Sequence, residues 1–313
     1  MPSEAERLLS SLSRKALNIE AEIDKRQTAL DRTIGGLERE LFSMLQAELF
    51  GQLEFESGKL IGNRHNLLLL LRIDAVFNQW QRQFGTDLLR EFVLGLLATA
   101  DMTGEMYAGM GAEQLLKDIA ADNATVQASI GVDGRGNVVQ GSVLYDISQV
   151  NQVRQDVKNV VLQAIKQQQT LREFSKTLRD YVVSSPDATG RLKTYWRTYA
   201  YDIFNQVAEV KNEQFRRGLD LQWFIYVGDV IKDSREFCRK KAGHVFAVIE
   251  ADTEWSKDPD LIGKKSGVPY VPRIDRGRWN CRHRIRYISE EMAVALDAEK
   301  VYSIKAKYGS KGI

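Results

Sequence analysis

The sequence predicts an α+β protein that is mainly α, with a helical body and a small C-terminal module rich in strands and loops. Two observations support this prediction. Apolar residues recur every three or four positions over most of the chain before Gly218, which is typical of amphipathic helices. After Gly218, short aromatic and β-branched runs alternate with polar loops, which is typical of strands. We expect three consecutive regions, 1–130, 131–218 and 219–313.

Bulk composition bounds the class of protein. The chain has 313 residues, of which 43% are hydrophobic and 27% charged, as is usual for a globular protein. A formal net charge of +2 argues against a protein devoted to nucleic acid, so such contact would need a local patch. The leucine run 67–71 is too short to span a bilayer, and the charged N-terminus does not resemble a signal peptide. We therefore expect an intracellular protein with no membrane contact.

The N-terminal region is expected to hold long amphipathic helices. Residues 5–50 carry a sustained apolar stripe, with paired glycines at Gly35 and Gly36. This pattern predicts one long helix or two helices that meet at the glycines, because glycine weakens a helix. The spacing drifts from a strict heptad, which favours a helical hairpin packed on the protein over a coiled-coil arm that binds a partner. Helices over 67–84 and 86–100 follow.

The middle region is expected to begin with a hairpin and to continue as helices. Glycines between short β-prone runs at 126–146 predict a surface hairpin. A phosphate-binding loop is disfavoured, because no Lys-Ser/Thr pair closes the motif. Thr170 and Glu173 have the spacing of a capping box at the start of a helix. The helices expected here cover 147–164, 170–183 and 192–218.

The C-terminal module is expected to contain short strands joined by functional loops. The segment 252–277 is polar and rich in proline and glycine, and a loop of this length usually has a function. Ser289 is expected to cap a last helix, and the lysine-rich tail 300–313 is expected to be mobile. The expected strands are Gln222–Val227, its antiparallel partner His244–Ile249, and Cys281–Ile288.

Both cysteines and two of the three histidines lie in this module, and three interpretations remain open. Two thiolates and two imidazoles suit tetrahedral zinc, although the spacing is not that of a zinc finger. A cysteine nucleophile with a histidine base is the second, but nothing marks an oxyanion hole or an orienting residue. In the third, which we favour, the cysteines are buried apolar groups and Asp233 with Arg235 forms a salt-bridged turn. We assign no catalytic residue and no cofactor other than a candidate zinc ion. The candidate metal ligands are Cys238, His244, Cys281 and His283.

A basic segment in the same module is a candidate contact surface. Between Lys264 and Arg286 there are eight Lys or Arg residues and one acid, Asp275, with aromatic residues between them. Such a segment suits phosphate neutralisation and base stacking, but it equally suits a solvated edge or an acidic protein partner. The candidate contact residues are Lys264, Lys265, Arg273, Arg276, Arg278, Arg284 and Arg286.

These motifs resemble the C-terminal signature of phage head-morphogenesis proteins, the Mu F-like minor head proteins of tailed bacteriophages. The family pattern is an Asp-x-Arg-x-x-Cys turn, a Gly-x-x-Phe strand and a closing Asn-Cys-Arg-Cys/His. Many members carry a second cysteine where this chain has Lys241, and many end in Cys where it has His283. Only a mixed Cys/His metal site therefore fits the resemblance. The signature residues are Asp233, Arg235, Cys238, Gly243, Asn280, Cys281, Arg282 and His283.

The resemblance implies a structural virion protein without enzymatic turnover. Such proteins are present in a few copies in the head, at or near the portal vertex, and act in head assembly and DNA packaging. The implied partners are the portal protein, major capsid or scaffolding proteins, and packaged double-stranded DNA. The implied location is the host cytoplasm during assembly and then the virion. The alternative is a metal- or Cys/His-dependent, nuclease-like enzyme that acts on nucleic acid.

Overall fold

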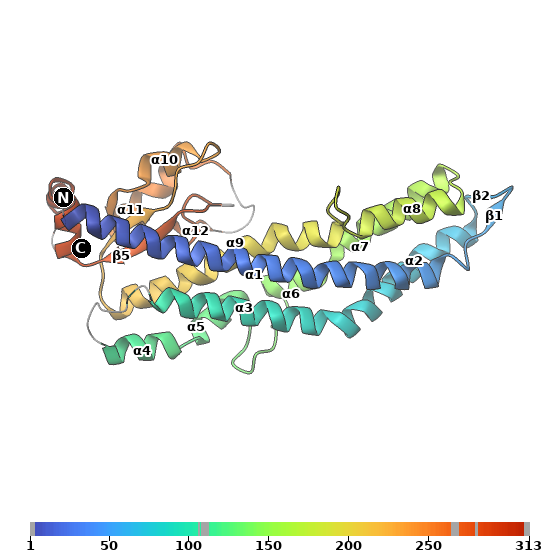
Figure 1. Ribbon diagram of the computed structural model, residues 1–313, viewed down its shortest axis with the longest axis horizontal. Helices are drawn as coiled ribbons and strands as arrows, with labels where there is room; N and C mark the ends of the chain where they lie inside the picture. The colour runs from blue at the N-terminus through green and yellow to red at the C-terminus, as the bar shows by residue number, and fades with distance from the viewer. Residues whose placement is uncertain (1–3, 106, 108–112, 264–268, 279–280, 310–313) are drawn as a thin grey trace. The chain divides into compact units, whose positions relative to one another are not determined.

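The computed structural model of the chain describes residues 4–105, 107, 113–263, 269–278 and 281–309. It confirms the α+β, mainly α prediction, because helices make up most of the chain and the strands form two small antiparallel sheets (Figure 1). None of the described helices combines the length and the apolar character needed to cross a membrane.

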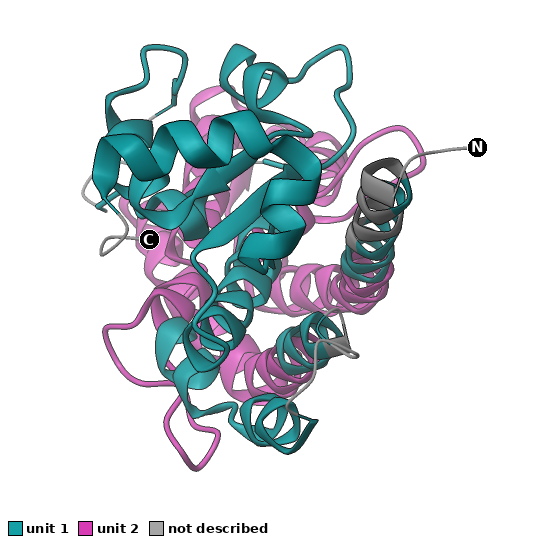
Figure 2. Cartoon of the chain, turned by 90° about the vertical axis from the view of Figure 1, so that its left-hand side faces the viewer, with its two compact units in different colours: residues 1–24, 96–130, 201–313 teal, residues 25–95, 131–200 magenta. Residues whose placement is uncertain are grey.

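The chain forms two compact units (Figure 2). Unit 1 contains residues 1–24, 96–130 and 201–313, and unit 2 contains 25–95 and 131–200. This division differs from the three consecutive regions expected from the sequence. The boundary between residues 130 and 131 coincides with an expected one, whereas the other three fall inside long helices, where no change in composition marks them. These helices are α1 (Glu4–Leu49), α3 (Thr86–Glu105) and α9 (Arg191–Gly218).

Helix α1 runs without a break through Gly35 and Gly36, so the predicted helical hairpin is wrong. A glycine costs a helix about 1 kcal/mol relative to alanine. The apolar stripe on both sides of the glycines is buried, with Ile34 and Leu41 at 0% exposure. Burial of a large aliphatic side chain is worth about 1.5–3 kcal/mol, which outweighs the local cost of the glycines.

Unit 2 is mainly helical and also contains the short hairpin β1–β2. Helix α2 packs along α7, and α7 packs along α8. Lys158 of α7 pairs with Asp74 of α2 at 2.7 Å. The helices expected over 67–84 and 86–100 are joined by one π-helical turn, η1 (Gln81–Gly85), rather than by a loop. The complete elements are β1 (Phe55–Glu56), β2 (Lys59–Leu60), α2 (Arg64–Trp80), η1, α6 (Val143–Ser148), α7 (Asn151–Lys166) and α8 (Leu171–Val182).

The hairpin expected at 126–146 is only partly correct. Val132 and Val138 form a single antiparallel bridge around the glycine turn. Asp133 tightens the turn by accepting the backbone N–H groups of Arg135 and Asn137. The run before the turn, however, is helix α5 (Ala124–Ile130), in which Val126 and Ile130 are buried at helical spacing. The capping box of Thr170 and Glu173 at α8 is confirmed.

A buried carboxylate organises the start of α9 in unit 2. Glu38 of α1 is 0% exposed. Its Oε1 accepts the backbone N–H of Lys193 at 3.0 Å, and its Oε2 accepts that of Ser184 at 2.9 Å. Lys193 lies in the first turn of α9, where backbone N–H groups have no partner within the helix. Glu38 therefore acts as an N-cap supplied by a distant helix.

Replacing Glu38 with alanine is expected to lower the free energy of unfolding by about 2–3 kcal/mol, because two buried N–H groups lose a charged acceptor. Chemical denaturation followed by circular dichroism measures this loss. Glu40→Ala is the matched control, since Glu40 lies on the same helix and is exposed. Equal stability of the two variants would show that the Glu38 carboxylate does not act as a cap.

Unit 1 contains a three-stranded antiparallel sheet in the order β4-β3-β5. The strands are β3 (Trp223–Val227), β4 (Val245–Ala247) and β5 (Arg284–Ile288). All three expected strands are confirmed with shorter bounds, since Val248 and Ile249 already belong to a helix, and β3 pairs antiparallel with β4 as predicted. Every residue of the three strands is buried, so both faces of the sheet are covered.

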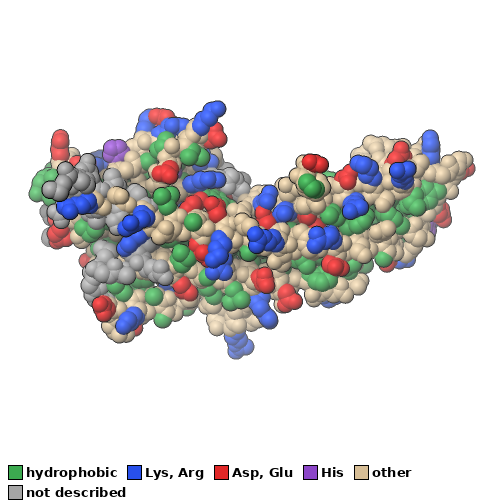
Figure 3. All heavy atoms as spheres, in the orientation of Figure 1, with side chains coloured by type: hydrophobic (Ala, Val, Ile, Leu, Met, Phe, Trp, Pro, Cys, Tyr) green, Lys and Arg blue, Asp and Glu red, His purple; other side chains and the backbone are tan. Residues whose placement is uncertain are grey.

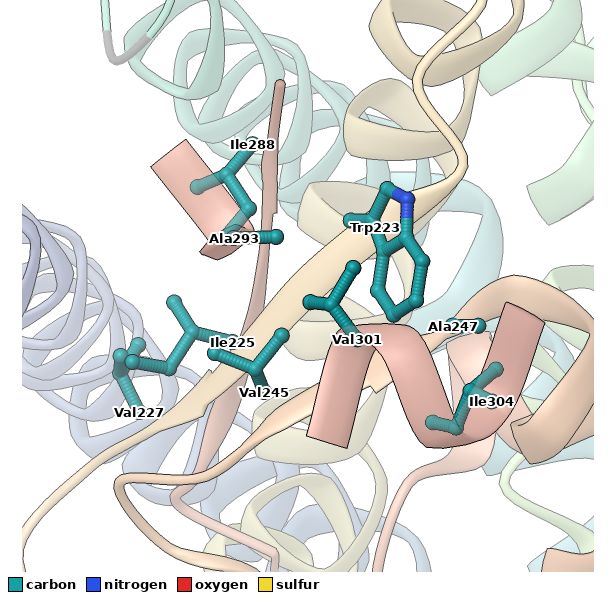
Figure 4. Close-up of a cluster of buried hydrophobic side chains, with 9 residues drawn as sticks. All are labelled: Trp223, Ile225, Val227, Val245, Ala247, Ile288, Ala293, Val301 and Ile304. Carbon is teal, nitrogen blue, oxygen red and sulfur yellow. The ribbon is translucent and has the colours of Figure 1, made fainter. Parts of the chain in front are cut away.

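One face of the sheet packs on the last helix, α13 (Glu290–Tyr308) (Figure 4). Trp223, Ile225 and Val227 alternate along β3 and meet Val301 and Ile304 of α13. Ser289 caps this helix by accepting the N–H of Met292, as predicted. The prediction of a mobile tail from residue 300 is wrong for 300–308, because this segment is helical and supplies core residues.

The other face carries an aromatic cluster around Trp255, which is 2% exposed. The rings of Phe224, Tyr226, Phe237 and Phe246 surround the indole, with centroids 5.3–5.5 Å away. All four are nearly perpendicular to it, an arrangement that aromatic quadrupoles favour. Trp255 lies in the segment 252–277 that was expected to be a loop. This segment instead includes the end of α11 (Val248–Glu254), η2 (Trp255–Lys257) and α12 (Pro272–Asp275).

Candidate functional site

The two cysteines meet at the end of β3. Tyr226 points its hydroxyl at both sulfurs, 3.2 Å from Cys281 Sγ and 3.6 Å from Cys238 Sγ. Cys238 lies in the short helix α10 (Glu236–Lys241), and Cys281 precedes β5. The two Sγ atoms are 3.9 Å apart, and both thiols are free and buried. The β3–β5 pairing thus brings together residues that are 43 positions apart.

His283 completes a cluster of three donors. Its imidazole stacks on the Tyr226 ring, with centroids 5.2 Å apart and planes 1° from parallel. Ligand atoms of Cys238, Cys281 and His283 all lie within 4.8 Å of one another. His283 is 3% exposed, and its Nε2 has no hydrogen-bond partner among the described residues.

Two glycines make room for this cluster. A Cβ at Gly277 would lie 2.5 Å from Cys238 Sγ and 3.0 Å from Cys281 Sγ. A Cβ at Gly228 would lie 2.9 Å from His283 Cα, and Gly228 also has a φ of 143°, which L side chains rarely adopt. Both positions therefore require glycine for the backbone to approach the donors closely.

The charge on the two sulfurs is shared unequally. The hydrogen bond from Cys238 lowers the pKa of Cys281, and His283 and the Arg276 cation act in the same direction against the effect of burial. The same hydrogen bond, together with burial, raises the pKa of Cys238. These contacts thus favour the thiolate form of Cys281, which is the form of cysteine that binds metals and acts as a nucleophile.

The cluster opens onto a cavity of about 230 Å³. The loop between β3 and α10 forms its wall, and Arg239 fixes this loop by donating to the carbonyls of Ile231, Lys232 and Ser234. Arg235 donates to the carbonyl of Gly277 at 3.0 Å. The cavity is lined by Asp229, Ile231, Asp233, Ser234, Arg235, Cys238, Cys281, Arg282 and His283.

The structure brings together three of the four candidate metal ligands. His244 is exposed and is not part of the cluster, so the four-ligand set expected from the sequence is corrected to three. His244 accepts the backbone N–H of Tyr226 through its carbonyl, and Gly243 donates to the Tyr226 carbonyl. These two residues therefore support the pairing of β3 with β4. Asn280 lies outside the described residues.

The basic segment is not the surface that its composition suggested. Arg276, Arg284 and Arg286 are 3%, 1% and 2% exposed, which excludes direct contact with nucleic acid in this structure. Arg273 pairs with Asp252 at 2.9 Å and also with Glu213, and Arg278 lies over the Tyr270 ring. Basic and acidic side chains are interspersed among the described residues on the face drawn in Figure 3. Lys264 and Lys265 lie outside the described residues.

The buried arginines belong to an ion network that the sequence did not reveal. Glu209 of α9 is 1% exposed and lies 3.0 Å from Arg276 and 3.7 Å from Arg284. Arg284 also pairs with Glu20 of α1 at 3.0 Å. Burial lowers the pKa of Arg286 to about 10, and the neighbouring Arg284 and Arg276 act in the same direction.

The same network reaches the donor cluster. Arg276 donates to the backbone carbonyl of His283 at 3.1 Å. Its guanidinium thus links the anion on α9 to the residue that completes the cluster. The sequence of α9 contains a pattern that could have indicated this network, because polar residues recur there at helical spacing among apolar ones. These residues are Asn205, Glu209, Asn212 and Glu213.

The arrangement suits two kinds of chemistry. Two sulfurs and an imidazole are ligands for zinc, and the adjoining cavity gives access to a fourth position. A thiolate beside an imidazole also suits a nucleophile. Comparisons of the chain with protein-family models, with curated proteins and with solved structures gave no match.

Proposed function

We propose that the chain is a structural minor head protein of a tailed bacteriophage. In this role it binds the portal protein and capsid or scaffolding proteins during head assembly and DNA packaging. One observation carries the proposal. Asp233, Arg235 and Cys238 are far in sequence from Cys281, Arg282 and His283, yet these six of the eight signature residues line one cavity. A chance similarity of short motifs would place no such constraint on their positions.

Two surface features are consistent with a role based on protein contacts. Arg282 is exposed and lines the cavity, as do the acidic residues Asp229 and Asp233. In unit 2, Leu68 and Leu71 of α2 are 51% and 64% exposed, which is apolar surface of the kind that protein partners cover. Contact with packaged DNA has less structural support, because three of the candidate arginines are buried.

The decisive experiment is to search intact particles for the chain. Particles of the phage that encodes it are purified by density gradient, quantified by mass spectrometry and imaged by cryo-EM. We expect a few copies per particle and density near the portal vertex. Particles that lack the chain, together with no affinity of the purified protein for portal or capsid proteins, would overturn the proposal.

A charge reversal at the cavity tests whether the signature residues contact a partner. Arg282→Glu is expected to reduce binding to the portal protein by about tenfold or more, as is usual when a charged interface residue loses its partner. Lys232→Glu is the matched control, since Lys232 is exposed in the neighbouring loop but does not line the cavity. An equal effect of both changes would show that only net charge matters.

A second candidate function is a metal- or Cys/His-dependent, nuclease-like enzyme. The observation that favours it is the opening of the three donors onto a cavity, since catalytic metal sites keep one position free for water or substrate. Cleavage of single- or double-stranded DNA by the purified protein, with its loss in His283→Gln, would support this function. A parent protein that cleaves neither substrate in the presence of zinc or manganese would exclude it.

A further inference from the structure

We infer that Cys238, Cys281 and His283 bind one Zn²⁺ ion, whose fourth position faces the adjoining cavity and is filled by water. This inference is independent of the proposed head-protein role, because it concerns the isolated protein. It rests on the donor set, the spacing of the donors, an unpartnered buried nitrogen and the position of the cavity.

The spacing of the two sulfurs matches a shared metal. In a tetrahedral site with metal–sulfur bonds of about 2.3 Å, two sulfur ligands are separated by about 3.8 Å. The Sγ atoms of Cys238 and Cys281 are 3.9 Å apart. A disulfide would require about 2.05 Å, so bonding the two sulfurs would need both side chains to move. Ligand atoms of all three residues lie within 4.8 Å of one another. A small inward movement of these side chains would bring all three within bonding distance of one ion.

The imidazole of His283 has one ring nitrogen without a hydrogen-bond partner among the described residues. This nitrogen is Nε2, and the residue is 3% exposed. Leaving a buried polar group unpaired costs about 1–3 kcal/mol, so such groups usually have a partner. Its ring is held in place by stacking on Tyr226, and its backbone by the hydrogen bond from Arg276.

The groups around the donors also suit a metal site. The Tyr226 hydroxyl is within reach of both sulfurs and can donate to one of them, as hydrogen-bond donors commonly do around metal-bound thiolates. Gly277 lets the backbone approach both sulfurs, where any side chain would collide. A Zn²⁺ ion with two thiolates is neutral, so the complex can be buried without a large desolvation cost.

The fourth position is supplied by the cavity. The described residues provide three donors in the cluster, and the same three residues line the cavity of about 230 Å³. Asp229 and Asp233 also line it but are not among the clustered donors. A water molecule in this position would lie among these carboxylates and the guanidinium groups of Arg235 and Arg282. Three protein ligands and one water are the usual composition of a reactive zinc site.

The test is zinc binding by the full chain, prepared without an affinity tag, reduced, and stripped with a chelator. Competition against a chromogenic chelator is expected to give one equivalent of tightly bound zinc. Cys281→Ser and His283→Gln should weaken binding by more than about 100-fold, and Tyr226→Phe by about 10–100-fold as a hydrogen-bond partner of the ligands. His244→Gln is the matched control and should bind like the parent.

Cobalt substitution provides a readout that does not depend on any variant folding. The parent protein loaded with Co²⁺ should show intense visible bands of a four-coordinate site and a near-ultraviolet band from thiolate ligands. Added azide should shift the visible bands by replacing the water. No equimolar zinc, or equal zinc in the parent and in Cys238→Ser with Cys281→Ser, would overturn the metal site. An azide-insensitive spectrum would overturn the water position. The zinc and cobalt measurements use the purified protein, so they do not depend on whether the chain is found in phage particles. The metal site and the head-protein role can therefore fail separately.

Discussion

Replacing Glu209 with glutamine is expected to lower the free energy of unfolding by about 3–5 kcal/mol, the usual cost of breaking a buried ion pair. Glu209 is 1% exposed and lies 3.0 Å from Arg276 and 3.7 Å from Arg284. When the charge of Glu209 is removed, the buried Arg276 cation loses the carboxylate that lies 3.0 Å away. Chemical denaturation of the parent and the variant at neutral pH measures the difference.

Two further variants separate charge from packing. Glu299→Gln is a matched control on the exposed surface of α13 and should change stability by less than about 0.5 kcal/mol. Glu209→Met combined with Arg276→Met removes both charges and should cost less than Glu209→Gln alone, because no unpaired ion remains buried. A double variant that is less stable than the single one would contradict this account of the network.

Replacing Trp255 with alanine is expected to cost about 3–5 kcal/mol, as for other large aromatic residues removed from a core. Its indole is 2% exposed and contacts four aromatic rings on one face of the sheet. The cavity left behind would adjoin Tyr226 and Phe237. The near-ultraviolet circular dichroism of the aromatic cluster should weaken along with the thermal stability.

Graded and control variants make this prediction specific. Trp255→Phe should cost less than Trp255→Ala, because a phenyl ring refills part of the volume. Tyr302→Ala removes an aromatic ring that is 61% exposed and should change stability by less than about 0.5 kcal/mol. A loss of less than 1 kcal/mol in Trp255→Ala would mean that the neighbouring rings move to fill the gap. That result would contradict the tight packing of the aromatic cluster.

The sequence predicted the strands well because their composition is locally decisive. Trp223–Val227 is an unbroken aromatic and β-branched run, and such residues are enriched in strands. Whether the helix breaks at Gly35 and Gly36 could not be decided from local composition. The outcome depends on whether flanking residues such as Ile34 are buried, and burial is set by distant parts of the chain. Local propensity alone could not show whether the cost of the glycines or the burial of the flanking residues would dominate.

The sequence predicted the donor cluster only in part, because the position of each donor depends on contacts between distant parts of the chain. Cys281 and His283 share a strand-like spacing, and Cys238 was included because a second thiolate suits zinc. His244 was included because histidine is a common ligand, and only the β3–β4 register shows that it lies outside the cluster. Arg276 was assigned to a contact surface because it lies in a basic segment with interspersed aromatic residues. Its partner Glu209 is 67 positions away, and no local pattern connects the two residues.

The ion pair of Glu20 with Arg284 joins residues that are 264 positions apart. At a synthesis rate of 5–20 residues per second, about 15–50 s pass between the emergence of the two partners from a ribosome. During this time the start of α1 has no β5 to meet, and the buried face around Ile19 and Ile23 stays open to chaperones. A nascent chain halted before residue 284 cannot make this ion pair, so completion of unit 1 waits for the last strand to be translated.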